Sequence, residues 1–321
     1  MPTLMEPLAP APTPPEDDLQ GSAGWGDKIF RGLSVSAGLS IMVTLAAVFF
    51  FLALEGIPGL SVDKSFYAPY SNFFAFVWPL VYGTTFAAIL ALILAVPFAI
   101  GIALFISHYA PRRLATPVAF VMDLLAAVPS VVFGLWGGLA LATFLKPAMV
   151  WLESHLGFIP FFAGPASVSG RTMMTAGVVL AIMILPITTA LCREIFSQTP
   201  RLHEEAALAL GATRWEMVRY AVFPYSRSGV VSAIMLGLGR ALGETMAVTM
   251  VLSSSPVVTL NIIGSENSRT IAAHIASNYK ETTPDKLAVL IAAGLVLFTF
   301  TFAVNFAARW VVGRGERRMA R

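Results

Sequence analysis

The sequence is poor in charged residues and in cysteine. Charged residues make up only 12% of its 321 residues, whereas hydrophobic residues make up 57%. Soluble domains carry about 25% charged residues, so this composition excludes an ordinary soluble globular protein and is typical of a polytopic membrane protein. Cys192 is the only cysteine, so no intrachain disulfide can form and the thiol cannot make a metal site by itself. We expect it to be a small packing residue.

The sequence also lacks the motifs of several enzyme classes. It contains no G-x-x-x-x-G-K-[ST] loop, so the chain cannot hydrolyse ATP by itself as a P-loop protein. It shows no nucleophile–base constellation and no metal-ligand spacing, which argues against a membrane enzyme. The net charge of +3 is too small to indicate a nucleic-acid partner. We therefore expect a chain that is not an enzyme and that binds neither a metal nor a cofactor itself.

Long apolar runs dominate what the sequence does contain. A helix needs ~20 apolar residues to cross a bilayer, and six segments come near or exceed that length: 34–54, 82–107, 115–145, 172–192, 228–254 and 287–308. The third is too long for one straight span, and Pro129 together with the glycines of GLWGGL predicts a bend in it. The pattern predicts an all-α polytopic membrane protein with about six transmembrane helices.

The polar segments predict how the chain is oriented. Residues 1–27 are rich in Pro, Ala and acidic residues without periodicity, and we expect a disordered tail followed by a membrane domain over 28–321. If the N-terminus is inside, fourteen of the 21 Lys and Arg residues lie on the inner side, six lie outside and one lies in the membrane. Because Lys and Arg are enriched in cytoplasmic loops, we expect both termini to be cytoplasmic. The expected location is the inner or plasma membrane of the cell.

The polar segment between the fourth and fifth apolar runs carries helix start and stop signals. Thr199 is expected to cap a helix that has Pro200 at its first position, and Gly211 stands where that helix wants a left-handed terminal residue. Thr213–Glu216 has the pattern of a capping box and predicts a second short helix. Pro224 predicts a break before the membrane. The segment therefore indicates two short helices at the cytoplasmic surface.

The fifth apolar run contains two formal charges. Arg240 lies near its middle, roughly 18–20 Å from either end at 1.5 Å per residue. Glu244 follows at i+4, so we expect the two side chains to share a helix face. Either they neutralise each other and lock helices together, or Arg240 lines an anion path while Glu244 moderates its field. Arg suits oxyanions because its planar fork donates two parallel hydrogen bonds. Gly237, Gly239 and Gly243 are expected to let another helix approach closely.

Two motifs resemble a known family. GLGRALGETMAV at Gly237–Val248 and LLAAVPSVVFGLWG at Leu124–Gly137 are similar to motifs of the PstC family, the permease subunits of phosphate-specific ABC importers. The resemblance covers about residues 29–312. Asp123 stands where the family usually has Glu, and Phe133 replaces a frequent Tyr.

The polar loop at about 199–224 resembles the EAA loop of ABC importer permeases, whose pattern is EAA-x3-G-x9-I-x-L-P. Glu205, Ala206, Ala207 and Gly211 match this pattern, and Pro224 is in register. Ala221 and Phe223 replace the usual Ile and Leu. A helix-turn-helix or an ordinary amphipathic loop would explain the three-residue EAA signal equally well if it stood alone.

The resemblance implies a type I ABC importer permease fold, with a permease core at about 81–308. It implies that Arg240 and Glu244 belong to the substrate path for phosphate, with Asp123 as a supporting residue. It also implies that Glu205, Ala206, Ala207 and Gly211 couple this path to an ATPase.

The implied partners are a second, PstA-like permease, a cytoplasmic PstB-like ATPase dimer that uses ATP, and an extracytoplasmic PstS-like phosphate-binding protein. Three alternatives stay open: a PstA-type subunit, a permease for another oxyanion, and an ATP-independent secondary transporter or channel. PstA segments tend to read RAIGETAP, so Met246–Val248 favours the PstC type.

Overall fold

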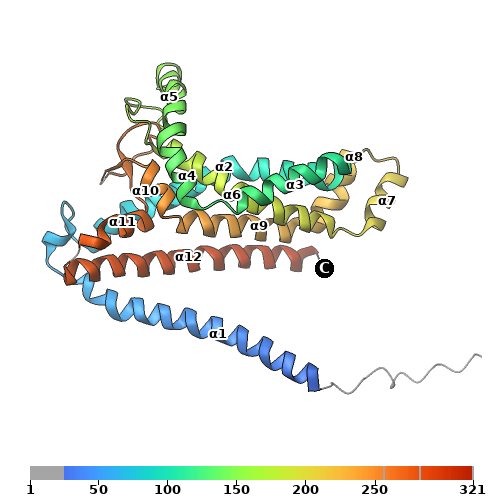
Figure 1. The fold of residues 1–321 in the computed structure, drawn as a ribbon, viewed down its shortest axis with the longest axis horizontal. Helices are drawn as coiled ribbons and strands as arrows, with labels where there is room; N and C mark the ends of the chain where they lie inside the picture. The colour runs from blue at the N-terminus through green and yellow to red at the C-terminus, as the bar shows by residue number, and fades with distance from the viewer. Residues whose placement is uncertain (1–24, 256, 282, 320–321) are drawn as a thin grey trace, which may run out of the picture. The chain divides into compact units, whose positions relative to one another are not determined.

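The computed structural model describes residues 25–255, 257–281 and 283–319. Twelve α-helices are present in these ranges (Figure 1): α1 Trp25–Gly56, α2 Phe73–Leu104, α3 Arg112–Ala126, α4 Ser130–Trp136, α5 Ala142–Leu156, α6 Met173–Ser197, α7 Arg201–Ala209, α8 Arg214–Met217, α9 Phe223–Gly243, α10 Met246–Val251, α11 Ile271–Asn278 and α12 Pro284–Met319.

Short 3-10 and π turns extend or join several of these helices: η2 Ile57–Leu60, η3 Lys64–Tyr67, η4 Phe105–Tyr109, η5 Gly137–Leu141, η6 Val218–Val222 and η7 Tyr279–Glu281. The only strands in the described ranges are β1 Ser254–Ser255 and β2 Asn267–Ser268, which form one parallel pair. The predicted all-α architecture is therefore confirmed.

Within the described residues, six helical segments are long and apolar enough to cross a membrane: Trp25–Leu60, Phe73–Tyr109, Ser130–Leu156, Met173–Ser197, Arg214–Gly243 and Pro284–Trp310. The predicted number of spans is confirmed. The expected tail at 1–27 falls mostly on residues 1–24, which lie outside the described residues. For Trp25–Asp27 the expectation was wrong, because α1 already begins at Trp25.

The chain divides into two units, one ending at Phe51 and one from Leu52 to Arg321. In the second unit α2, α6 and α9 pack together, and α12 lies beside α9 (Figure 1). From its middle onward α2 buries a row of alanines four residues apart, each exposed by 1% or less: Ala87, Ala91, Ala95, Ala99 and Ala103. Lipid is as apolar as these side chains, so small residues stabilise the helix pair by allowing close backbone approach.

The third predicted span, 115–145, is wrong in its boundaries. The helix breaks after Ala126, and Pro129 precedes the start of α4, so the crossing segment is Ser130–Leu156 instead. The predicted bend at Pro129 is confirmed. The glycines that follow serve packing: a Cβ on Gly134 would lie 2.7 Å from the Cα of Ala247, and one on Gly138 would lie 2.9 Å from the carbonyl oxygen of Met250. Only glycine at these positions lets α4 and η5 lie this close to α10.

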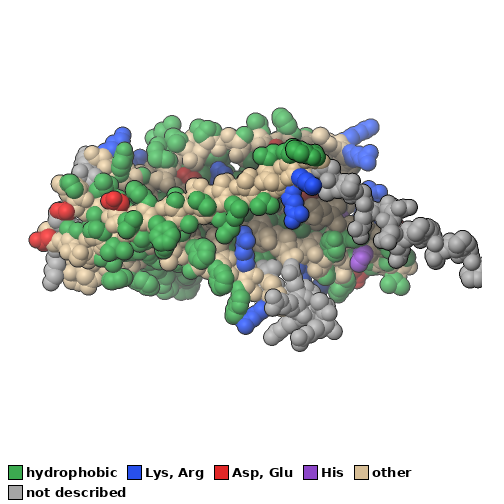
Figure 2. All heavy atoms as spheres, turned by 90° about the horizontal axis from the view of Figure 1, so that it is seen from below, with side chains coloured by type: hydrophobic (Ala, Val, Ile, Leu, Met, Phe, Trp, Pro, Cys, Tyr) green, Lys and Arg blue, Asp and Glu red, His purple; other side chains and the backbone are tan. Residues whose placement is uncertain are grey.

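Hydrophobic side chains cover much of the face shown in Figure 2, where Lys, Arg, Asp and Glu side chains are few. Monomeric soluble proteins rarely expose large contiguous apolar patches, so this surface fits contact with lipid or with other membrane subunits.

Candidate transport and coupling sites

The predicted fifth span, 228–254, is not one helix, and the segment long enough to cross is Arg214–Gly243 instead. α9 ends at Gly243, Glu244 adopts an extended backbone conformation (φ −67°, ψ 127°), and α10 begins at Met246. The predicted continuous run over 228–254 is therefore wrong. A carboxylate oxygen of Glu244 accepts a hydrogen bond from the backbone N–H of Ala247 at 3.1 Å. This bond satisfies one of the backbone donors left open where a helix begins, so the glutamate stabilises the break.

Arg240 lies in the last turn of α9 and is half-buried. Its Nε atom is buried and has no hydrogen-bond partner among the described residues. Within the described ranges, no ion pair joins Arg240 to Glu244. The i+4 spacing does not lead to a direct contact here, because the Glu244 carboxylate accepts from the backbone of Ala247. The structure therefore leaves a guanidinium beside non-helical backbone. Inside a membrane such backbone is tolerated only where it lines a cavity or is covered by protein.

Two other expectations about this region have mixed outcomes. Asp123 is exposed on α3 and forms no ion pair with a described residue, so the structure does not bring it to Arg240 as a partner. A Cβ on Gly237 would lie 2.8 Å from the Thr188 hydroxyl of α6, which confirms the expected close helix approach there. Around Gly239 and Gly243 no atom of the described chain comes within 4 Å of such a Cβ.

The predicted end of the loop's first helix at Gly211 is confirmed. Gly211 has φ +85° and follows α7. The N–H of Ala212 donates to the carbonyl of Ala207 at 3.2 Å, and the N–H of Gly211 donates to the carbonyl of Leu208 at 2.9 Å. These two bonds define a Schellman motif, which requires a residue in the left-handed region at this position.

The capping box that begins the second short helix is also confirmed. The Thr213 hydroxyl accepts from the N–H of Glu216, and the Glu216 carboxylate accepts from the N–H of Thr213 at 2.8 Å. The two side chains thus each accept from a backbone N–H that has no partner within the helix at the start of α8.

Two local predictions in this loop were wrong. α7 begins at Arg201 with Pro200 in the capping position. The hydroxyl of Thr199 is buried and, in the part of the chain that the structure describes, has no hydrogen-bond partner instead of capping the helix. Pro224 does not break the chain before the membrane. It sits in the first turn of α9, directly after the π turn η6, where a missing N–H is tolerated.

The EAA residues lie on a helix with two different faces. Glu205 and Ala206 are exposed, whereas Ala207 is half-buried against an apolar cluster that includes Phe196 and Val222. Large apolar side chains are exposed close by, with Leu202 at 74% and Leu210 at 90%. One face of α7 therefore packs on the membrane helices, and the other offers an acid and apolar groups to a partner.

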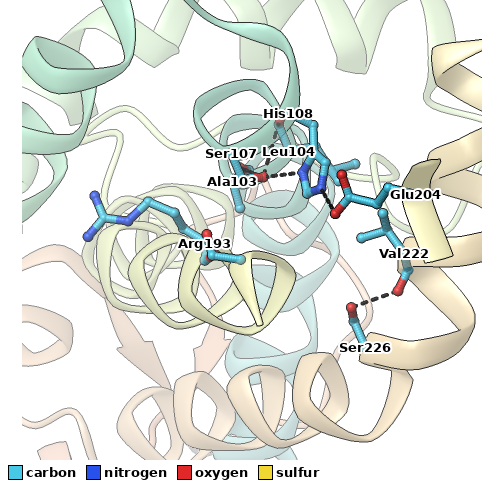
Figure 3. A network of polar contacts seen from close by, with 9 residues as sticks. Ala103, Leu104, Ser107, His108, Arg193, Glu204, Val222 and Ser226 are labelled. Carbon is cyan, nitrogen blue, oxygen red and sulfur yellow. Dashed lines mark hydrogen bonds and ion pairs between the residues drawn. The ribbon is translucent and has the colours of Figure 1, made fainter. Parts of the chain in front are cut away.

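A polar contact that the sequence analysis missed joins α7 to the end of α2. Figure 3 shows Ser107, His108 and Glu204 in a row, and Nε2 of His108 lies 3.4 Å from a carboxylate oxygen of Glu204. This is the one ion-pair contact among the described residues. No local pattern predicts it, because its two partners are 96 positions apart.

A cavity of about 220 Å³ lies elsewhere in the second unit, lined by Tyr70, Arg269 and His274 together with apolar groups. Burial, with a smaller contribution from the neighbouring Arg269 charge, lowers the pKa of His274 to about 4, so this imidazole is neutral near pH 7. Neither Arg240 nor Glu244 lines this cavity. In the described part of the chain no three His, Cys, Asp or Glu residues gather in a way that could hold a metal ion.

Comparison with known proteins identifies the family. The profile of the family described as "Binding-protein-dependent transport system inner membrane component" matches residues 95–317. The chain is 45% identical over 300 residues to "Phosphate transport system permease protein PstC 2" of Mycobacterium tuberculosis, and the matched region covers 90% of this chain and 92% of that protein. It is 36% identical over 317 residues to "Phosphate transport system permease protein PstC" of Xylella fastidiosa (strain Temecula1 / ATCC 700964), covering 95% and 96%.

A solved structure shares the fold. An inward-facing conformation of the MetNI methionine ABC transporter superposes with a TM-score of 0.50 and 15% identity, covering 74% of this chain and 93% of that one. At this identity the likeness concerns the fold alone, and it confirms the expected importer-permease architecture. From the profile match and the relatives at 36–45% identity, the chain belongs to the binding-protein-dependent transport system permease family, and within it to the PstC proteins.

Proposed function

We propose that this chain is a transmembrane permease subunit of an ATP-driven importer of inorganic phosphate. The observation that carries the proposal is the identity of 45% to a phosphate transport permease over nine-tenths of both chains. The two motifs that resemble the PstC family, around Pro129 and around Arg240, meet in the structure because α4 packs against α10. The family's characteristic residues therefore lie around the break in the fifth span.

In this proposal Arg240 holds the passing oxyanion. Its guanidinium lies beside the break between α9 and α10, and its Nε atom lacks a partner within the described chain. A planar guanidinium donates bidentate hydrogen bonds to phosphate-like oxygens. Glu244 contributes by holding the break through its bond to Ala247. Its negative charge also keeps Arg240 from acting as an uncompensated cation, which would retain the anion.

The loop from α7 to α8 couples the path to ATP hydrolysis. The exposed Glu205 and Ala206, with Leu202 and Leu210 beside them, form a surface that suits docking in a groove of a cytoplasmic, PstB-like ATPase dimer. Gly211 sets the turn that presents this surface. ATP is used by that partner, and this chain binds no cofactor itself.

Two further partners complete the proposed importer. A second, PstA-like permease shares the translocation path, and the open surface at Gly239 and Gly243 leaves room for a close helix contact. An extracytoplasmic PstS-like protein delivers phosphate. The Lys and Arg distribution supports cytoplasmic termini and a cytoplasmic coupling loop in an inner or plasma membrane.

Substrate competition tests the proposed cargo. Cells that lack high-affinity phosphate uptake receive this chain with its three partner proteins, and the matched control omits only this chain. We expect radiolabelled phosphate uptake that excess unlabelled phosphate suppresses and that excess sulfate or molybdate leaves unchanged. Uptake of sulfate or molybdate without uptake of phosphate would assign the chain to another oxyanion.

A further inference from the structure

We propose that the contact between His108 and Glu204 is the link that carries movement of the coupling helix α7 into the membrane helix α2. It makes Glu204, the acid just before the EAA triplet, a positioning residue for coupling. This inference rests on the proposed function, since it presupposes that a partner ATPase moves α7.

Both residues of the contact lie on helical elements. His108 belongs to η4, the π turn that directly continues α2, and Glu204 lies in the first turn of α7. Nε2 of His108 and the carboxylate oxygen of Glu204 are 3.4 Å apart, and the two side chains are only 7% and 23% exposed. Partial burial reduces screening by water, so the interaction is stronger than an exposed pair at the same distance.

Ser107 fixes the orientation of the imidazole. Its hydroxyl lies 2.7 Å from Nδ1 of His108 and 2.8 Å from the carbonyl oxygen of Ala103 (Figure 3). An ionised carboxylate only accepts hydrogen bonds, so Nε2 must carry the hydrogen that faces Glu204. The single hydrogen of the Ser107 hydroxyl is donated to the Ala103 carbonyl, and the serine oxygen stands against Nδ1. The serine thus holds the ring with Nε2 turned toward Glu204.

The two acids of α7, Glu204 and Glu205, have different surroundings. Glu204 and Ala207 lie three residues apart and so share a face, and both are half-buried. Ala207 packs on the apolar cluster that contains Phe196 and Val222, and Glu204 reaches His108. Glu205 is exposed on the other side. One acid is therefore available to a partner while its neighbour holds the helix to the membrane domain.

The contact connects α7 to a membrane helix that its main packing contacts do not include. The main helix contacts of α7 are with α8 and η6, which lead into α9. The His108–Glu204 contact adds a direct connection to α2, and α2 packs extensively along α6. A displacement of α7 is thereby transmitted directly to α2 and α6, without passing through α8, η6 and α9.

Coupling measurements on the complete importer in proteoliposomes test the link. ATP hydrolysis and radiolabelled phosphate uptake are measured together for Glu204→Ala, His108→Ala, the double variant and Glu204→Gln. The control is Glu194→Ala, which removes an exposed acid from the nearby cytoplasmic end of α6. We expect phosphate taken up per ATP hydrolysed to fall ~3-fold or more in each single alanine variant.

The pattern across variants separates a link from simple stabilisation. The double variant should be no worse than either single, because both remove the same contact. Glu204→Gln should recover most of the coupling, since its amide oxygen still accepts from Nε2. An unchanged uptake-to-hydrolysis ratio in both alanine variants, or additive losses in the double, would overturn the proposal. If the unmodified complex shows no ATP-driven phosphate uptake, the proposed function itself fails, which is a distinct result.

Discussion

Arg240 is the single residue on which the proposed anion path depends most. An arginine in a membrane-spanning helix costs several kcal/mol unless it faces protein, water or a partner. The carbonyl groups at the C-terminal end of α9 favour a cation there, because a helix carries partial negative charge at that end. Glu244 does not neutralise it through a direct contact, since its carboxylate is bonded to the backbone of Ala247. The cation is therefore positioned by a helix end and not by an ion pair.

Substitutions at Arg240 separate an oxyanion site from a helix-locking pair. Arg240→Lys keeps the charge but loses the planar fork, so we expect phosphate uptake to fall roughly tenfold with normal membrane abundance. The double variant Arg240→Leu with Glu244→Leu should insert yet fail to transport. Replacing a buried ion pair by apolar groups is often neutral or stabilising, so uptake equal to the unmodified protein in the double variant would show that the two residues only hold helices together.

Among the elements, the turn between α7 and α8 sets how the coupling surface is presented. Gly211 has φ +85° and ends α7 in a Schellman motif, yet a Cβ there would meet no atom of a described residue within 4 Å. The requirement for glycine is therefore conformational and not steric. Backbone strain, and not lost packing, is what a substitution would introduce.

A pair of substitutions at Gly211 tests this conformational requirement. An ordinary residue in the left-handed region costs about 1–2 kcal/mol, and a β-branched one costs more, whereas asparagine tolerates it. We expect Gly211→Val to lose most phosphate uptake while still inserting in the membrane, and Gly211→Asn to retain it. Normal uptake by a well-expressed Gly211→Val variant would count heavily against a role for this turn in coupling.

The elements also show which sequence signals predict structure. The turn at Gly211 and the capping box at Thr213–Glu216 depend on neighbouring residues, and both were predicted. Thr199 has a good capping side chain, but burial at the end of α6 overrides that local preference. The break at Glu244 and the contact of His108 with Glu204 depend on tertiary packing that no periodicity records.

For the whole molecule, the apolar runs predicted six spans because lipid imposes a minimum helix length. They misplaced the third span, because α3 is amphipathic and Pro129 separates it from the crossing segment. Sequence distance cannot show that Arg240 lies at a helix end, because the break after Gly243 has no local signal.

The proposed orientation is open to cysteine labelling. On a background with Cys192→Ala, which removes a buried thiol, the exposed positions 214 and 265 are changed separately, as Arg214→Cys and Ser265→Cys. Because the Lys and Arg bias places the coupling loop inside, position 214 should react with an impermeant reagent only from the cytoplasmic side. Position 265 should react only from outside. The reverse labelling pattern in intact cells would invert the topology.

ATP dependence of phosphate transport is the most direct test of the whole account. The complete importer, reconstituted in proteoliposomes with its phosphate-binding protein, is supplied with ATP on the ATPase side, and radiolabelled phosphate accumulation is measured. The matched control carries a hydrolysis-deficient ATPase. We predict accumulation against a phosphate gradient that requires this chain, hydrolysable ATP and the binding protein together. Equal phosphate flux with the hydrolysis-deficient ATPase, or with no ATPase present, would contradict the account and identify the chain as an ATP-independent transporter or channel.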